Sequence, residues 1–267
     1  MNRRVLLRLC GAGVIGLGGC NRTVQGGGLS APGDWRLDFR DRFRGGGLDG
    51  DNWGIGWGWG RETENSPTTI AESNVTVENG RLRLAGTNDG GTIESGAIHS
   101  KNRVTFGPGS YLEARIKFAT RDGFLNAFWG KPNNEAWPPE IDVVEQWYID
   151  DDSSRHSQHH LHYSGSTEPG DDSTHESLGT SYEPGDDLGE NFHVYGLEWR
   201  TDRLVHYVDG TEVSVWDDET MVTAMERGAP FYMMFSLYIN KVGTADSDEP
   251  WPERMVVDWV RLWTLTN

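Results

Sequence analysis

The chain has 267 residues, a formal net charge of −17 and a sequence pI near 4.8. This charge argues against electrostatic binding to nucleic acid or to an anionic membrane surface. The length suits one domain with a substantial core, and the 35 glycines and 12 tryptophans favour all-β structure with many turns, since helical periodicity is weak throughout.

The basic residues are almost all arginine. Of the 24 lysines and arginines only four are lysines, namely Lys101, Lys117, Lys131 and Lys241. An acidic, lysine-poor composition is typical of proteins from salt-loving archaea, in which dense screening limits self-repulsion. The alternative is an acidic secreted protein from an ordinary habitat, and we favour the halophile.

The N-terminus reads as an export signal. Arg3 and Arg4 precede a short apolar run at residues 9–17, which is too short to span a bilayer and predicts a twin-arginine signal peptide over residues 1–20. Gly-Gly-Cys at its end resembles a lipobox and predicts lipidation of Cys20, the alternative being an ordinary signal with a chance cysteine. Residues 21–33 would then be a flexible tether, and residues 34–267 a folded domain held on the outer face of the cell membrane.

Both cysteines, Cys10 and Cys20, lie in this leader. No disulfide can therefore stabilise the main domain, which must depend on packing.

Early in the domain, residues 53–60 pair three tryptophans with four alternating glycines. Trp57 and Trp59 share parity, so on an extended segment they would form one aromatic face suited to stacking on sugar rings. Tryptophans at strand ends also serve as core residues, and both interpretations stay open.

Strand-like segments recur at regular intervals. Asn79-Gly80 predicts a tight hairpin turn between two of them. Their spacing, with long antiparallel connections, predicts a two-sheet sandwich. The expected strands cover residues 36–43, 75–77, 81–84, 96–100, 111–118, 126–129, 140–146, 160–163, 193–199, 204–208, 212–216, 231–238 and 255–262.

Three acids interrupt one of these segments, in the sequence Glu-Ile-Asp-Val-Val-Glu from Glu140 to Glu145. Alternation places Glu140 and Asp142 on one face, and Glu145 joins them only if a β-bulge inserts one residue near Val143. Two glutamates leaning together over the shorter aspartate could reach the separation of about 5–5.5 Å that retaining glycoside hydrolysis uses.

Crowded like charges raise at least one carboxyl pKa, so the three acids would titrate together. The flanking Trp129, Trp137 and Trp147 favour catalysis on a sugar, because flat aromatic faces are common platforms for sugar rings. The alternative is an acidic edge strand with solvated carboxylates.

The motif resembles the bulged E-x-D-x-x-E signature of glycoside hydrolase family 16, which includes laminarinases and agarases. Further segments agree in order, at residues 95–101, 109–117, 126–129, 192–199, 207–210 and 257–261, so the resemblance covers residues 36 to 265. It implies a β-jelly roll, similar to concanavalin A, with a concave sheet that forms a substrate cleft.

The resemblance also implies the roles. Glu140 would attack the anomeric carbon, Glu145 would protonate the leaving oxygen and then activate water, and Asp142 would tune Glu140, with no cofactor in catalysis. Trp129 and Trp137 would hold sugars near the cleavage point. The first expectation is a secreted, monomeric endo-hydrolase of β-1,3(-1,4)-glucan. The alternatives are a non-catalytic carbohydrate-binding protein, a transglycosylase and an agar-type galactan hydrolase.

The histidines between residues 156 and 162 invite a zinc site, but they enter a strand from a polar loop and we expect none. The family instead places a histidine of the neighbouring strand opposite the acids. We assign this place to His162, with His160 on the same face as the second choice and a solvated strand-end histidine as the alternative.

Asp258 matches an aspartate that binds a structural calcium in several relatives, with backbone oxygens near Gly80. A strand-end cap is the alternative. Two residues depart from the family: Pro139 replaces a common glycine before Glu140, and Ser236 stands where relatives often carry a cleft asparagine. Both bear on the choice of glycan.

Overall fold

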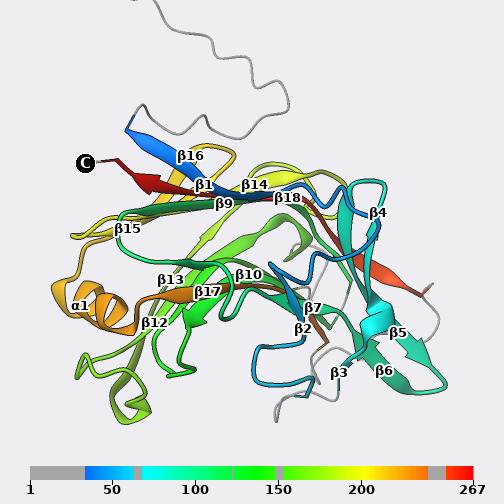
Figure 1. Cartoon of the computed structure of the whole chain (residues 1–267), viewed down its shortest axis with the longest axis horizontal. Coiled ribbons are helices and arrows are strands. Elements are labelled where there is room, and N and C mark those ends of the chain that lie inside the picture. Colours follow the sequence, from blue (N-terminus) through cyan, green and yellow to red (C-terminus); the bar gives the residue numbers. More distant parts are fainter. Residues whose placement is uncertain (1–33, 63–67, 122, 148–152, 240–250, 267) are drawn as a thin grey trace, which may run out of the picture.

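The computed structural model describes residues 34–62, 68–121, 123–147, 153–239 and 251–266. Two β-sheets lie face to face in this part of the chain, with one short helix beside them (Figure 1). The predicted all-β two-sheet sandwich is confirmed. No helix in the described ranges is both long enough and apolar enough to cross a membrane.

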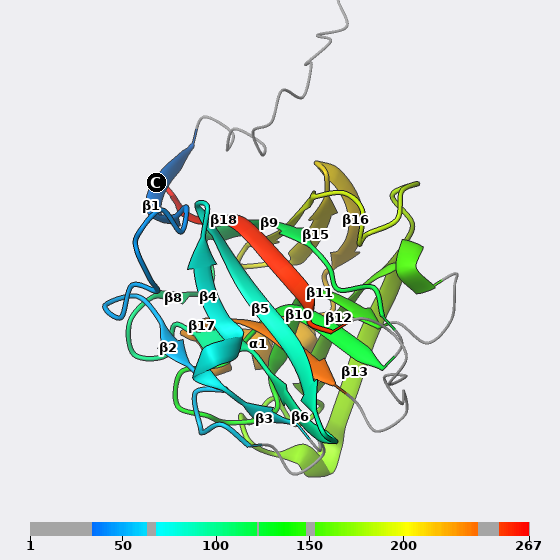
Figure 2. The ribbon, with the colours of Figure 1, turned by 90° about the vertical axis from the view of Figure 1, so that its right-hand side faces the viewer.

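The larger sheet has ten strands, in the order β16-β15-β14-β9-β18-β5-β6-β3, with β1 paired to β18 and β4 paired to β5. Figure 2 shows β5 and β18 running beside each other in this sheet. The strands are β1 (Trp35–Asp41), β3 (Thr69–Ile70), β4 (Val75–Glu78), β5 (Arg81–Asp89), β6 (Thr92–Ser95), β9 (Ser110–Lys117), β14 (His193–Trp199), β15 (Leu204–Val208), β16 (Thr211–Trp216) and β18 (Glu253–Leu265).

The smaller sheet has eight strands, in the order β13-β12-β11-β10-β17-β7-β2, with β8 paired to β17. They are β2 (Gly54–Ile55), β7 (Ala97–His99), β8 (Thr105–Phe106), β10 (Phe124–Pro132), β11 (Glu140–Trp147), β12 (Ser157–Ser164), β13 (His175–Tyr182) and β17 (Phe231–Ile239). Short 3-10 turns at Glu72–Asn74, Ser153–Arg155 and Asp172–Thr174 complete the connections.

The core lies between the sheets. Alternate residues of both sheets point inward, and among them the rings of Phe128 and Phe235, neighbours on β10 and β17, stack with centroids 4.5 Å apart. Burial of such side chains supplies the main stabilisation in a domain without disulfides. The Asn79-Gly80 turn is also confirmed, since both residues have the positive φ that a tight hairpin requires.

The fold has elements beyond the predicted strands, namely one helix, the edge strand β13 and the short strands β2, β3, β6 and β8. The helix α1 (Glu219–Gly228) was not predicted, and its first turn is capped by the Asp218 side chain, which accepts from the Met221 amide at 2.9 Å. The edge strand β13 was also not predicted, because its residues are mostly exposed and polar and give no apolar alternation.

Candidate active site

The acidic strand β11 carries the predicted bulge. Against β10, Phe128 pairs with Val144 and Trp129 with Asp142, so Val143 has no partner in the ladder. Against β12, the register also shifts between Asp142 and Glu145. This extra residue is what returns Glu145 to the face that holds Glu140 and Asp142.

The three acids meet in one pocket of about 300 Å³. Its walls come from β10, β11, β17 and the loop after β2, so the smaller sheet holds the cleft. The lining residues are Trp57, Trp59, Leu125, Ala127, Trp129, Glu140, Asp142, Glu145, Ser236 and Tyr238.

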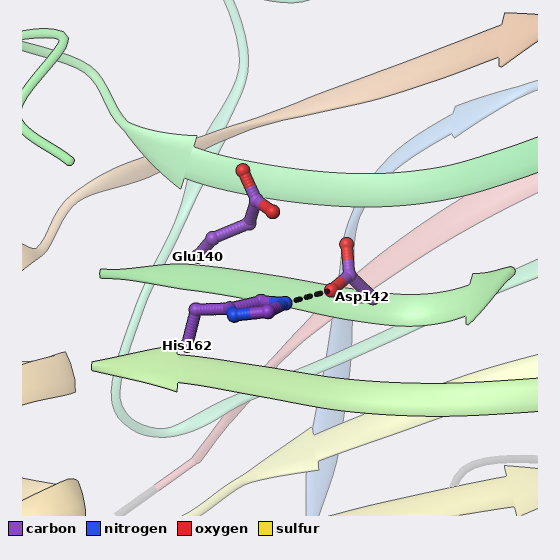
Figure 3. A group of neighbouring side chains, drawn as sticks. All are labelled: Glu140, Asp142 and His162. Atoms are coloured by element: carbon purple, nitrogen blue, oxygen red, sulfur yellow. Dashed lines mark ion pairs between the residues drawn. The ribbon is translucent and has the colours of Figure 1, made fainter. Parts of the chain in front are cut away.

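Histidines of β12 contact the acids. His160 Nδ1 lies 2.8 Å from Glu145 Oε2, and His162 Nε2 lies 3.5 Å from Asp142 Oδ2 (Figure 3). Oδ2 of Asp142 is buried and accepts no hydrogen bond from the described residues. Both histidines considered from the sequence therefore face the cleft, and it is His160 that touches a glutamate.

Two overlapping sets of ligand-type atoms result. Glu140, Asp142 and His162 form one set and Asp142, Glu145 and His160 the other, and within each set the atoms lie within 4.8 Å of one another. Each set offers two carboxyls and one imidazole, which together could hold a divalent ion. Alternation along β12 sends His159 into the core, away from His160 and His162.

Burial and mutual repulsion raise the carboxyl pKa values. Burial, followed by the charge of Glu145, raises the pKa of Glu140 to about 8, while Lys131 and a hydrogen bond from the Trp137 side chain act in the opposite direction. Burial and both glutamates raise the pKa of Asp142 well above its usual range. The site therefore holds protons at neutral pH, as expected for crowded carboxyls.

The tryptophans of the cleft divide into buried and exposed rings. Trp57 is 4% exposed and packs with Ile70 and Ala97, whereas Trp59 is 44% exposed and stacks on it, with centroids 5.9 Å apart. The chain bends here at glycines with positive φ and does not form the extended segment expected from parity. The core interpretation thus fits Trp57, and the accessible sugar platform fits Trp59.

The other two tryptophans lie on either side of the acids. Trp129 donates from Nε1 to Ser236 Oγ at 3.1 Å. Ser236, which stands where relatives often carry an asparagine, therefore helps to fix the Trp129 ring. Trp137 is 38% exposed and packs against His175 of β13, with centroids 4.9 Å apart.

Sequence reasoning missed several contributors to the site. Lys131 Nζ lies 4.6 Å from the Trp59 ring centroid and pairs with Glu135, which also pairs with Lys101. His175 Nε2 lies 3.0 Å from His162 Nδ1. Lys131 lies on the same face of β10 as Trp129 by alternation, a signal that could have been used.

The residues around Asp258 do not fit the expected calcium site. The Asp258 carboxylate accepts from Arg115 Nη1 at 2.7 Å, and Arg81 Nε lies 3.5 Å away. Two guanidinium groups neutralise this carboxylate and repel a cation. Gly80 forms the nearby hairpin turn and has the positive φ that this turn needs. The predicted signal peptide, the lipidated Cys20 and the tether lie outside the described residues.

A sandwich of two β-sheets, with three carboxyls at a bulge in an aromatic cleft, defines the class of a retaining glycoside hydrolase. The family model for the GH16 domain of β-porphyranases A to D matches residues 36–265. The chain belongs to glycoside hydrolase family 16, as its motifs indicated.

Named relatives agree on the family and differ in substrate. Glucan endo-1,3-β-glucosidase A1 of Niallia circulans is 26% identical, in an alignment of 265 positions that covers 85% of this chain and 37% of that protein. β-Porphyranase B of Zobellia galactanivorans is 27% identical, over 66% of this chain and 67% of its own length. The endo-β-1,3-glucanase structure from Pyrococcus furiosus is 28% identical, with a TM-score of 0.70 over 87% of this chain and 95% of that one.

The first four curated relatives are longer proteins, and the chain spans only 30–39% of their lengths. The similarity is therefore to one domain of each.

Proposed function

We propose that this protein is a retaining endo-hydrolase of a neutral β-linked glucan, with 1,3- or mixed 1,3/1,4-linkages. The observation that carries the proposal is the bulge at Val143, which sets Glu140, Asp142 and Glu145 in one aromatic pocket. A non-catalytic binding protein would use the tryptophans and have no need of three converging acids.

The free site holds a proton on Glu140, and for the reaction this proton must lie on Glu145 once the sugar is bound. In the first step, Glu145 then gives it to the leaving glycosidic oxygen while the ionised Glu140 bonds through a carboxylate oxygen to the anomeric carbon. In the second step, Glu145 takes a proton from water, whose oxygen attacks that carbon and breaks the ester to Glu140. Asp142 is buried between the two glutamates and its pKa is raised well above normal. It therefore keeps a proton, and a protonated Asp142 offers a donor to Glu140 when that carboxyl ionises, which would favour the ionised nucleophile.

The charge of the pocket supports a neutral glycan. Among the described residues that line the pocket, three are acids and none is a cation. Lys131 lies beside the pocket, where its charge acts on Glu140, but it is 8% exposed and pairs with Glu135. A sulfate group in this pocket would be repelled, because no lining cation offsets the acids.

A second candidate substrate is a sulfated galactan, because the matching family model describes porphyranases. We rank it second on the charge of the pocket. Transglycosylation would use the same residues with a sugar hydroxyl in place of water, and analysis of the products distinguishes it from hydrolysis.

The deciding experiment is a panel of laminarin, mixed-linkage β-glucan, agarose and porphyran, assayed at low and high salt. Wild type should release oligosaccharides from a glucan, with salt testing the predicted halophily. Glu145→Gln should lose about 10²–10⁴-fold in kcat on substrates with a poor leaving group, and Glu140→Gln at least as much. Turnover of a glycan that neither substitution slows would refute the assigned roles.

Export and anchoring remain proposals that rest on the leader alone. Cys20→Ala should release the protein from the membrane fraction of its host, and unchanged membrane association would argue against lipidation.

A further inference from the structure

The bulge that aligns the acids leaves main-chain carbonyl groups outside the sheet ladder. Val143 and Val144 both lie opposite His159 of β12, so the regular exchange of backbone hydrogen bonds is interrupted there. Both valines are fully buried, and water does not reach them. A buried carbonyl without a partner costs free energy, so a bulge at this depth needs a donor.

His159 supplies this donor. Its neighbours His160 and His162 face the cleft, whereas His159 points into the core and is fully buried. Its Nδ1 lies 2.7 Å from the carbonyl oxygen of Val143. The side chain therefore hydrogen-bonds to the inserted residue, one position from Asp142 and two from Glu145.

The surroundings fix the tautomer of His159. A carbonyl oxygen can only accept, so Nδ1 carries the proton. Burial lowers the pKa of His159 to about 4, so the ring is neutral and its Nε2 is an acceptor. The Ser157 hydroxyl lies 3.1 Å from Nε2 and donates to the Tyr182 carbonyl at the same distance, so the bond to Val143 is the one that fixes the ring.

A second buried histidine supports the first from the opposite sheet. His206 of β15 packs its ring against that of His159, with centroids 5.3 Å apart, and lies close to the main chain of Asp142. Trp216 Nε1, which can only donate, lies 3.2 Å from His206 Nδ1, so the neutral ring carries its proton on Nε2. Two neutral imidazoles therefore lie beneath the bulge, on the side away from the substrate.

We infer that His159 is a positioning residue, which holds the bulge through the Val143 carbonyl and thereby keeps Glu145 on the same face as Glu140. The inference rests on the proposed hydrolase function. Without the hydrogen bond the bulge could move along β11 or the strand could return to regular pairing, and a one-residue slip sends Glu145 toward the core. A displacement of about 1 Å at a reacting group can cost about 10² in rate.

The test compares two amides at this position. Asn places its amide N–H close to the position of Nδ1, whereas Gln extends one bond further and cannot donate to Val143 from the same place. We expect His159→Asn to keep kcat within about threefold of wild type. We expect His159→Gln and His159→Leu to lower kcat about 10- to 100-fold, with KM changed less than about threefold.

His193→Leu is the matched control, because His193 is also buried, on β14, and is bound to Asp209 at 2.7 Å far along the chain from the bulge. It should lower the thermal midpoint and leave the kcat of the folded protein unchanged. If His159→Gln and His159→Leu behave like this control, the role is structural only and the inference fails.

A measurement without substrate separates this inference from the proposed function. Nitrogen NMR of the histidine rings should show His159 with its proton on Nδ1 from pH 5 to 8. A proton on Nε2, or titration near the ordinary pKa of histidine, would overturn the inference even in an active enzyme. If wild type cleaves no glycan while His159 has the expected tautomer, the proposed function fails and the hydrogen bond stands.

Discussion

Glu140→Gln should abolish activity and yet stabilise the fold at alkaline pH. The pKa of Glu140 is raised from 4.5 to about 8, mainly by burial. The native protein therefore holds a proton over a pH range in which the unfolded chain has released it. The sign follows from linkage. The contribution of Glu140 to the free energy of unfolding is highest below about pH 4.5 and falls as pH rises toward 8.

The magnitude follows from the same displacement. At about 1.36 kcal/mol per pH unit, ionising Glu140 in the native state costs up to about 5 kcal/mol. The pKa of Asp142 is raised as well, and this second buried carboxyl remains in the variant, so we expect glutamine to recover about half, or about 2–3 kcal/mol at pH 9. For a domain of this size that is an increase of about 4–12 °C in Tm.

The assay is guanidinium unfolding followed by tryptophan fluorescence at pH 4, 7 and 9. The two proteins should be nearly equal in stability at pH 4 and should diverge as pH rises. Glu78→Gln, at a carboxyl whose side chain is 62% exposed, is the control and should show no such divergence. A Glu140→Gln variant that gains no stability between pH 4 and pH 9 would refute the account of a buried, proton-holding carboxyl.

Three further outcomes follow from the site and its surroundings. Trp59→Ala should raise KM about tenfold with little change in kcat or Tm, because the exposed ring offers a stacking surface worth about 1.4 kcal/mol; an unchanged KM would remove this ring from the substrate path. Gly179→Ala should lower kcat with little loss of stability, since a Cβ on this exposed edge strand would overlap the ring of His160, lie 2.8 Å from its Nε2 and displace it from Glu145. Unaltered kinetics would show that the contact between His160 and Glu145 is dispensable. Millimolar calcium or EDTA should leave Tm within about 1 °C, because Arg115 already binds the Asp258 carboxylate; a calcium-dependent rise of several degrees would restore the calcium site.

The sequence was informative where side-chain alternation carried the signal. Most of the longer strands followed from period-two patterns, the hairpin turn from the Asn79-Gly80 pair, and the bulge near Val143 from the misfit of Glu145. A bulge could be predicted because three acids have no reason to share a buried strand unless they also share a face.

Other features could not be read in this way. Edge strand β13 is mostly exposed, so it lacks the apolar alternation that marks a strand, although its His175 contacts His162. Helix α1 did leave a signal, since Met221, Ala224, Met225 and Gly228 are buried at helical spacing after the capping Asp218. The short length of the helix hid this pattern among the strands.

The calcium expectation depended on a single carboxylate. Alternation along β9 and β18 did not reveal that Arg115 would lie beside Asp258, because the pairing register of these strands is a tertiary property. The same holds for His159. Its neighbours in sequence face the acids, and only the register of β11 against β12 shows that His159 lies beside the Val143 carbonyl.

The central claim is that a kinked strand presents Glu140 as the group that bonds to the sugar. An activated 2-deoxy-2-fluoro glycoside of the glycan cleaved in the panel should trap the intermediate, and peptide mass spectrometry should locate it. We predict one glycosyl adduct, on Glu140. An adduct on Glu145 instead, or turnover of the reagent with inversion and no adduct, would contradict the account.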